Sequence, residues 1–377
     1  MKLTINTAQF QSMVAKAVKG AGMNNDLFIT QLMSISLRDN MLTLETTDNN
    51  NYLYVRLDKV AGEDFNVVVP ADKFAKLIAK LTCENVTLEI PTAKAGELDK
   101  LVIKGNGKYV IELPYDEEGE LIEFTDPIAE TTDDFWSTAE LQLSTVRHIL
   151  STAKAALLVG KDDMCYSDYY VGNRIVATDT YKICGIDIKI FDEPKLISPQ
   201  LMDLLDVMTS ENIDVRYKDD VVIFETGDVI VYGSVDEGID EYQIDAINGL
   251  LDEQFPSSCK IDKIALTQML DRLSLFVDVL DKNSVYLTFT SEGMLVSSKQ
   301  DSGSEIIPYK ESKNFKDYTC CLDIDIFKTQ VKAYQNDVIE MFYGKENSIK
   351  LVLGNTKQII ALADDDRAVE EEDTEEE

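Results

Sequence analysis

One pattern of apolar residues occurs three times along this chain, at a spacing that matches a whole domain. Each occurrence opens with a segment of helical periodicity, and its apolar positions are Phe10, Met13, Val14 and Val18, then Val146, Ile149, Leu150 and Ala153, then Leu266, Met269, Leu270 and Leu273. A second apolar helix and a short strand follow each time, and the strand begins near Glu84, Glu211 and Asn336. The period of 127 and then 125 residues is too long for a solenoid repeat. It predicts three similar domains.

Between the paired helices the sequence alternates between apolar and polar residues, as half-buried strands do. Examples are residues 41–46, 52–57, 221–224 and 294–297. Each unit therefore reads as strand, helix, several strands, helix and more strands, which predicts an α+β fold with helices on antiparallel sheet. Acidic stretches mark the joints and predict domains at 1–127, 128–253 and 254–363, followed by an acidic tail at 364–377.

Several features argue for a cytoplasmic protein without disulfides. No apolar run approaches the roughly 18 residues that a membrane-spanning helix needs. The first residues, Met1-Lys2-Leu3-Thr4, lack the basic and apolar regions of a signal peptide. Six cysteines in 377 residues form no Cys-x-x-Cys pair, which is typical of reduced thiols. We expect no membrane partner.

The charge distribution separates the helices from the rest of the chain. The net charge is −33, which alone would argue against DNA as a partner. In the five segments 7–19, 72–81, 144–158, 263–277 and 325–335, however, basic residues outnumber acidic ones 11 to 3. Lysines three and four positions apart, such as Lys73, Lys76 and Lys80, share one helical face. The segment 199–210 departs from this pattern, because it has two aspartates and no base.

Basic helices on an acidic protein have two interpretations. Helices favour lysine and their outer faces are often simply solvated. The alternative is that these helices hold duplex DNA by its phosphates without reading bases, while the acidic remainder repels nucleic acid. The sequence has no zinc-finger spacing and no helix-turn-helix signature, so we expect no sequence-specific readout.

Five segments resemble a known family, and they occur along the chain in the order in which that family has them. Residues 176–183, Val-Ala-Thr-Asp-Thr-Tyr-Lys-Ile, are similar to the Ala-Thr-Asp-Gly-His-Arg-Leu signature of the bacterial DNA polymerase III beta subunit, the sliding clamp. Residues 1–5, the segment 27–29 and the segment 42–48 resemble the amino terminus of the family, and residues 68–74 resemble its Val-Pro-Ala entry to the second helix. The resemblance covers residues 1 to about 363, and its divergence suggests a phage-encoded or otherwise distant member. It implies the cytoplasm of a bacterial cell or of a phage-infected host.

This resemblance implies a DNA clamp fold whose three-domain chains pair head to tail into a ring. Two helices per domain would line the hole, duplex DNA would pass through it, and a DNA polymerase and a clamp loader would bind the ring. The protein would be a processivity factor in DNA replication, with no enzymatic activity, no cofactor and no metal. The expected DNA-facing residues are Lys16, Lys19, Lys73, Lys76, Lys80, Arg147, Lys154, Lys161, Lys263, Arg272, Lys328 and Lys332.

The resemblance also implies a pocket for a short apolar partner peptide, between the second and third domains. The matching positions are Tyr166, Thr178, Thr180, Tyr181, Lys182 and Ile183 in the second domain, and Ile359, Ile360, Ala361 and Leu362 in the third. Thr180-Tyr181-Lys182 replaces the Gly-His-Arg of the family, so the shape of the pocket differs. The alternative for Tyr166 and Ile183 is ordinary core packing.

For the dimer interface, the positions that match the apolar contacts of the family are Tyr109, Ile111, Phe276 and Val277. Burial in the domain cores is the alternative for these four residues.

Two further functions are weighed against a clamp. An acidic protein that imitates DNA would explain the net charge, and the tail at 364–377, with ten acids and Arg367, would suit it. It would not explain the basic helices. A carboxylate- or metal-dependent hydrolase is formally compatible with so many acids, but no pair stands out. The single histidine, His148, leaves little for a catalytic triad or a multi-histidine metal site.

Overall fold

The computed structural model describes residues 1–22, 27–92, 98–125, 127–130, 136–158, 165–235, 238–277, 283–300 and 302–363. The chain forms two compact units. The first contains Met1–Val146 and Gln200–Val235, and the second contains Arg147–Pro199 and Asp236–Glu377. The tail at 364–377 and Lys161 lie outside the described residues.

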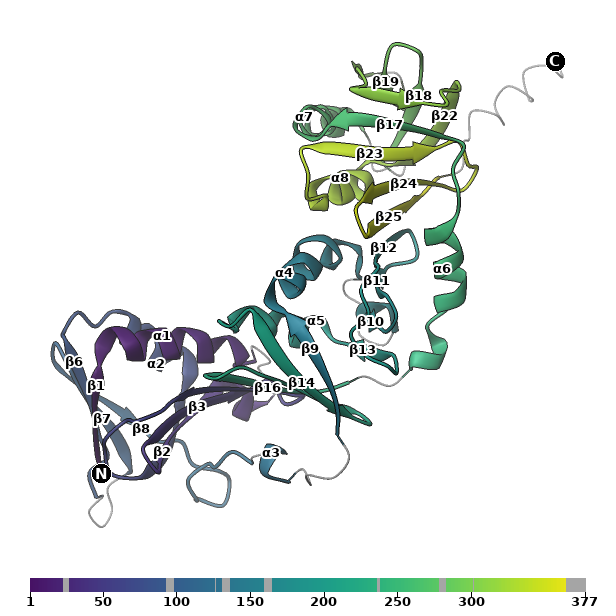
Figure 1. Ribbon diagram of the computed structural model, residues 1–377. Coiled ribbons are helices and arrows are strands. Elements are labelled where there is room, and N and C mark those ends of the chain that lie inside the picture. The colour runs from purple at the N-terminus through teal and green to yellow at the C-terminus, as the bar shows by residue number, and fades with distance from the viewer. Residues whose placement is uncertain are drawn as a thin grey trace. The chain divides into compact units, whose positions relative to one another are not determined.

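The same order of elements occurs three times: a strand, a helix, four strands, a second helix and three strands (Figure 1). The first copy has β1 (Lys2–Asn6), α1 (Thr7–Ala17), β2 (Leu32–Arg38), β3 (Met41–Thr47), β4 (Asn51–Leu57), β5 (Phe65–Pro70), α2 (Ala71–Ala79), β6 (Asn85–Glu89), β7 (Lys100–Lys104) and β8 (Lys108–Glu112). The second has β9 (Ser137–Gln142), α4 (Leu143–Thr152), β10 (Tyr169–Val171), β11 (Ile175–Thr178), β12 (Lys182–Ile186), β13 (Lys195–Ile197), α5 (Pro199–Leu204), β14 (Asn212–Lys218), β15 (Val221–Glu225) and β16 (Val229–Ser234).

The third copy repeats this order with one insertion, the short strand β21 (Glu311–Lys313). Its other elements are β17 (Ser257–Asp262), α7 (Lys263–Leu273), β18 (Ser284–Phe289), β19 (Met294–Ser298), β20 (Ser304–Ile307), β22 (Tyr318–Asp323), α8 (Ile324–Ala333), β23 (Val338–Tyr343), β24 (Ser348–Leu353) and β25 (Thr356–Ala361). Two helices, α3 (Pro127–Glu130) and α6 (Ile244–Asp252), connect successive copies. The predicted triplication is confirmed.

All registered strand pairs are antiparallel, and two sheets run from one copy into the next. In the first unit the sheets have the orders β1-β6-β7-β8 and β5-β2-β3-β4-β16-β15-β14-β9. In the second unit they are β13-β10-β11-β12-β25-β24-β23-β17-β21 and β20-β19-β18-β22. Strand β4 pairs with β16, and β12 pairs with β25. The two units therefore divide the second copy between them, because half of its strands belong to each shared sheet. The boundaries near 127 and 253 stay a prediction.

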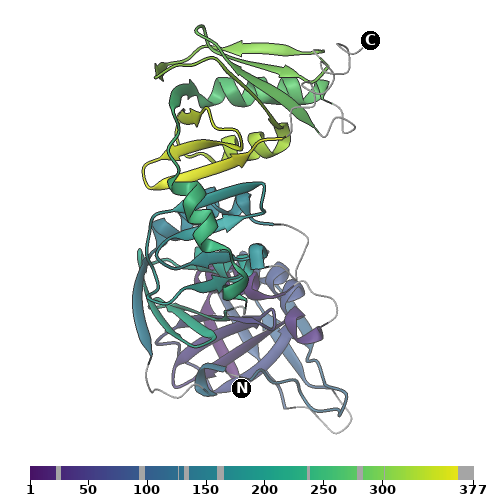
Figure 2. The same ribbon diagram turned by 90° about the vertical axis from the view of Figure 1, so that its right-hand side faces the viewer.

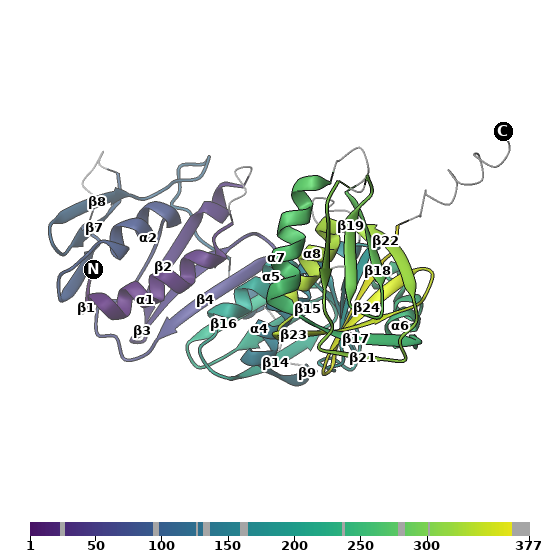
Figure 3. The same ribbon diagram turned by 90° about the horizontal axis from the view of Figure 1, so that it is seen from above.

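In the first copy, the two helices pack side by side on the sheets (Figure 3). The buried residues of α1 are Thr7, Phe10, Met13, Val14 and Ala17, which agrees with the predicted helical face apart from Val18. Phe10 meets Phe74 of α2 edge to face, with ring centroids 6.0 Å apart. The side chain of Asn6 accepts a hydrogen bond from the Gln9 amide and so caps the amino terminus of α1.

The third copy has an equivalent core. Leu266, Met269, Leu270 and Leu273 of α7 are all buried, as the sequence predicts. Phe327 and Val331 of α8 join them, and the ring of Phe289 stacks on Tyr343 at a centroid distance of 3.8 Å. Asp262 and Asp323 cap the two helices through their carboxylates. The expected α+β fold with antiparallel sheets is confirmed.

Candidate functional site

Most of the predicted DNA-facing side chains reach solvent. The exposed ones are Lys19, Lys73, Lys76, Lys80, Arg147, Lys154, Arg272 and Lys332. Lys16, Lys263 and Lys328 are half-buried. Helical periodicity places them there, because the apolar stripes of the same helices face the sheets. Whether these side chains contact DNA stays a prediction.

Carboxylates neutralise part of this charge in the first unit. Lys16 donates to Asp228, on the turn between β15 and β16, at 2.6 Å, and Thr209 donates to the same carboxylate at 3.0 Å. Burial opposes ionisation of Asp228, but the hydrogen bonds from Lys16 and Thr209 outweigh it and lower its pKa. Lys76 pairs with Asp72 one turn earlier on α2, at 2.8 Å. Lys73 and Lys80 make no ion pair within the described residues.

The bases of the third copy are engaged more fully. Asp271 of α7 lies 2.7 Å from Lys328 and 3.4 Å from Lys332, both on α8. Arg272 donates twice to Glu305 on β20, at 2.8 and 2.6 Å, which is a bidentate arrangement.

Lys263 has a structural role. Its ammonium donates to the main-chain oxygens of Lys332 and Tyr334, at the carboxyl end of α8, where cations are favoured. This engagement argues against the expectation that Lys263 faces DNA. The sequence around Lys263 could not indicate this contact, because Lys263 and Tyr334 are 71 residues apart.

The predicted peptide-pocket residues meet where β12 pairs with β25, inside the second unit. Ile183 lies opposite Ile359 in the ladder, and both belong to one apolar cluster with Val176, Leu196 and Tyr242. Tyr166 packs against the same cluster and meets Tyr242 edge to face at 5.1 Å. The sequence thus brought together residues that are 176 positions apart.

Ile360 is the exception. Successive residues of a strand point to opposite faces, so Ile360 lies on the other side of β25 from Ile359. It is fully buried in the core of the third copy. The expectation that it lines an apolar cleft is therefore wrong.

The helix α6 covers the cluster around Ile183 and Ile359, beside β12 and β25 (Figures 1 and 2). Ile247 and Leu251 are its buried side chains. A Cβ at Gly185 would lie 2.5 Å from the Leu251 side chain, so this close approach requires glycine.

Charged groups fasten α6 to the strands beneath it. Arg174 donates to Asn248 and Asp252, and Lys357 pairs with Asp252 at 2.6 Å. The hydrogen bond from Lys357 is the main cause of the lowered pKa of Asp252. Lys350 donates to the main-chain oxygens of Leu251 and Glu253, at the carboxyl end of the helix. The apolar parts of the predicted pocket are consequently covered in this structure.

Sequence reasoning missed Tyr170, Tyr242, Ile247 and Leu251 in this site. A signal was present, because the segment 242–251 carries apolar residues at helical spacing. Its acidic composition led instead to its interpretation as a joint.

The loop before β12 carries the exposed part of the predicted pocket. Thr178 and Lys182 lie at the two strand ends, and Tyr181, at the tip, is 64% exposed. Thr180 has φ +78°, a conformation that disfavours a β-branched residue. Asp179 holds the turn by accepting hydrogen bonds from the amides of Tyr181 and Lys182, and it pairs with the Lys182 ammonium. Ala361 donates its amide to the Tyr181 carbonyl, and Leu362 is half-buried.

The predicted interface residues divide into two groups. Tyr109 is partly exposed on β8, and Phe276, which ends the short helix η7 (Ser274–Phe276), is 54% exposed. Val277 is half-buried against the core of the third copy. Ile111 is only 2% exposed, so its side chain belongs to the core of the first copy, and the expectation that this side chain makes an apolar interface contact is wrong.

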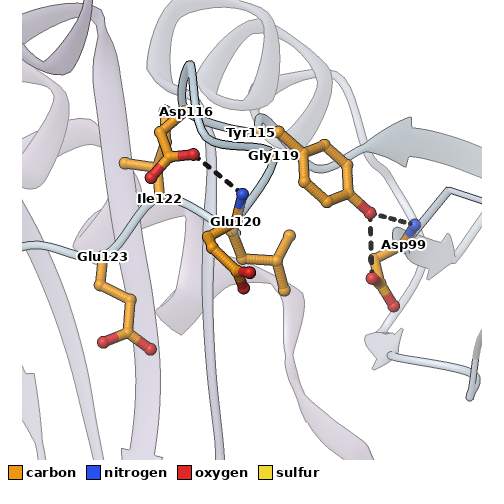
Figure 4. A pocket seen from close by; sticks show the side chains of 8 residues that line it. Asp99, Tyr115, Asp116, Gly119, Glu120, Ile122 and Glu123 are labelled. Carbon is orange, nitrogen blue, oxygen red and sulfur yellow. Dashed lines mark hydrogen bonds between the residues drawn. The ribbon is translucent and has the colours of Figure 1, made fainter.

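A cavity lies away from these residues, beside the loop after β8 (Figure 4). It has a volume of about 780 Å³, and most of its polar lining is carboxylate. The Tyr115 hydroxyl donates to Asp99 at 3.0 Å, and Asp116 accepts from the Glu120 amide at 2.8 Å. Among the described residues, no group of three or more histidine, cysteine or acidic side chains is arranged to hold a metal ion.

His148 on α4 lies at a polar contact within the second unit. Its Nε2 is 2.8 Å from the Thr356 hydroxyl on β25. Burial lowers the pKa of His148. In the described part of the chain, no helix is both long and apolar enough to cross a membrane.

Paired helices on antiparallel sheets that continue from one repeated unit into the next define the class of DNA clamp folds. Residues 1–117 match the family described as DNA polymerase III beta subunit, N-terminal domain. No curated protein sequence matches the chain. For residues 1–117 this match confirms the resemblance inferred from the motifs.

Solved structures show the same fold over nearly the whole chain. The DNA polymerase sliding clamp of Bacillus subtilis matches with a TM-score of 0.79 at 15% identity, covering 97% of this chain and 99% of that chain. The DNA polymerase III subunit beta of Borrelia burgdorferi has a TM-score of 0.81 at 15% identity, with the same coverage. That of Thermotoga maritima has 0.77 at 19% identity, covering 96% and 99%.

The strained turn leads to a first prediction. Glycine removes the penalty of a positive φ, of about 1–3 kcal/mol, but loses about 0.5–1 kcal/mol through greater freedom in the unfolded chain. Thr180→Gly should therefore raise the free energy of unfolding by about 1 kcal/mol, as measured by urea denaturation. Thr180→Ala, which keeps a Cβ, should recover much less. Loss of stability in the glycine variant would contradict the strain.

The buried histidine leads to a second prediction. Because its native pKa lies below the ordinary value of about 6.5, the unfolded chain binds the proton more readily. At pH values well above 6.5, His148 is neutral in both states and should not affect the free energy of unfolding. As the pH falls below about 6.5, protonation of His148 in the unfolded chain should reduce the free energy of unfolding. His148→Gln should weaken the loss of stability between pH 7.5 and pH 5.5, measured by thermal unfolding. An identical pH dependence in both proteins would contradict the assignment.

Proposed function

We propose that this protein is a DNA sliding clamp, which closes head to tail into a ring around duplex DNA and tethers a DNA polymerase to it. The observation that carries the proposal is a rule of strand pairing. In each copy, the third of the four strands after the first helix is β4, β12 or β20, and the last strand is β8, β16 or β25. The third strand of one copy pairs with the last strand of the next: β4 with β16, and β12 with β25.

By this rule, two strands of the single chain have no partner from another copy: β20 of the third copy and β8 of the first. Each ends a four-stranded sheet, half the size of the sheet that joins the first two copies. Pairing β20 of one chain with β8 of a second would repeat the same joint, and unpaired edges favour such pairing. A head-to-tail homodimer would then have six copies and no free joint.

Exposed apolar residues at both edges support this joint. Ile306 on β20 is 51% exposed, and Leu275 and Phe276 on η7 are also exposed. Tyr109 and Val110 on β8 are the corresponding residues of the first copy. Val110 and Ile306 were not among the interface residues expected from the sequence, because exposure of an edge strand cannot be read from its composition. Leu275, on η7, was not among them either.

The helices support a sequence-independent contact with DNA. Most of their exposed cations are lysines, spread over several elements, which suits contact with phosphates of any sequence. Such side chains attract phosphates weakly and allow movement along the duplex. Encirclement would then supply the retention that contact does not.

The proposed docking site for an apolar peptide of a polymerase or a clamp loader lies at the edge of the cluster at β12 and β25. Tyr166 and Tyr170 are the partly exposed aromatic side chains of that cluster, and Tyr181 is exposed on the loop before β12. A DNA-imitating inhibitor or a hydrolase would need neither a peptide site nor matched strand edges. Hydrolase assays and loading onto nicked circular DNA separate these alternatives.

The dimer gives a third prediction. Phe276 is exposed in the single chain, so Phe276→Asp should leave the fold intact and place an unpaired carboxylate in the joint. Such burial costs about 3–5 kcal/mol, enough to weaken the dimer more than a hundredfold. Native mass measurement at micromolar concentration should show dimers for the original protein and monomers for the variant. Tyr181→Asp, which places the same charge at an exposed aromatic position away from the joint, should remain dimeric. A wild-type monomer at every salt concentration would contradict the ring.

The peptide site gives a fourth prediction. Tyr166→Ala should weaken binding of a short apolar peptide from the cognate polymerase about tenfold, because an aromatic anchor contributes about 1–2 kcal/mol. Fluorescence anisotropy with a labelled peptide measures this effect. Ile264→Ala, which removes an exposed apolar side chain from α7, is the control. Equal affinities in folded variants would contradict the assignment of the site.

A further inference from the structure

Matched helices of the first and third copies differ in how their cations are used. On α2, Lys73 and Lys80 are exposed and form no ion pair in the described part of the chain. On α8, Lys328 and Lys332 both point to Asp271, at 2.7 and 3.4 Å. The two helices hold the same place in the order of elements, so this difference belongs to the sequence and not to the fold.

The difference arises from one position on the preceding helix. Both α1 and α7 contain 11 residues, and their ninth residues are Ala15 and Asp271. In the third copy this carboxylate meets the two lysines one helical turn apart on α8. The hydrogen bond from Lys328 lowers the pKa of Asp271, so the carboxylate stays charged at neutral pH. In the first copy the side chain of Ala15 is a methyl group, which carries no charge and cannot accept a hydrogen bond from the lysines of α2.

Arg272, beside Asp271 on α7, is screened in the same way. Its guanidinium is held by both oxygens of Glu305 on β20. A cation in a bidentate carboxylate pair has few donors left for a phosphate. Three of the four predicted DNA-facing bases on the third copy are thus paired with acids, and the fourth, Lys263, caps α8.

We propose that the DNA grip of the ring is graded: the first copy holds phosphates through Lys73 and Lys80, while Asp271 withholds Lys328 and Lys332. This proposal rests on the proposed clamp function. In a ring of two chains, duplex DNA would be drawn toward the two first copies and would meet a nearly neutral surface at the third. Asp271 is then a positioning residue that sets how strongly the ring grips DNA.

The test compares matched double variants on a short linear duplex. The slope of log affinity against log salt changes by about 0.9 for each phosphate contact. Lys73→Ala with Lys80→Ala should reduce the slope by about 1.8, and Lys328→Ala with Lys332→Ala by less than half of that. Asp271→Asn should free the two lysines, tighten binding and raise the slope by up to about 1.8.

Two controls exclude an indirect effect. Asp271→Glu keeps the carboxylate and should bind DNA as the original protein does. Asp192→Asn removes an exposed carboxylate that pairs with Lys189 at 2.8 Å, between β12 and β13, and should leave the slope unchanged. The native mass of every variant is measured, so that loss of the dimer is not mistaken for loss of DNA contacts.

Equal losses for the two lysine pairs, or an unchanged slope in Asp271→Asn, would overturn the graded grip. Failure of the clamp function itself looks different, because the original protein would then not stay on nicked circular DNA at all. If the original protein stays on nicked circular DNA but the two double lysine variants show equal salt slopes, the clamp function stands and only the graded grip is rejected.

Discussion

The pairing of a strand from one copy with a strand from the next is the constraint on which the structure depends. β4 joins β16 and β12 joins β25, and these ladders build shared sheets out of copies that are separate in the sequence. A β-strand edge that remains open favours a further strand. The edges of β8 and β20 are left with the same open pairing in the single chain. The proposed head-to-tail ring would use these two edges for its closure by a second chain.

Electrostatics adds a second constraint, because the chain is strongly acidic and the proposed clamp would have to admit a polyanion. Lysines on the helices would attract the phosphates of DNA. The ion pairs of Lys16 with Asp228 and of Lys328 with Asp271 would weaken this attraction, so that fewer phosphate contacts have to break when the ring moves. A clamp of this kind would owe its retention to topology and not to affinity.

The sequence predicted the fold because the fold rests on repeated local patterns. The buried faces of α1 and α7 follow directly from apolar spacing, and the meeting of Ile183 with Ile359 follows from the family motifs. It could not predict that Ile111 and Ile360 point into cores, because the face of a strand depends on which neighbour it packs against. It also could not predict the Lys16–Asp228 pair, whose members are 212 residues apart. At Thr180 the sequence did contain a signal. Thr180 stands where the family motif has glycine, and its backbone has the positive φ that glycine tolerates best.

Encirclement is the central claim, and one measurement tests it most directly. The protein is loaded onto nicked circular DNA, transferred to high salt, and its retention is followed before and after the circle is cut at one site. Salt screens phosphate contacts but cannot open a closed ring, so the account predicts retention on circles and rapid loss once the DNA is linear. Equal retention on circular and linear DNA would show that the protein grips DNA by contact, and would contradict the account.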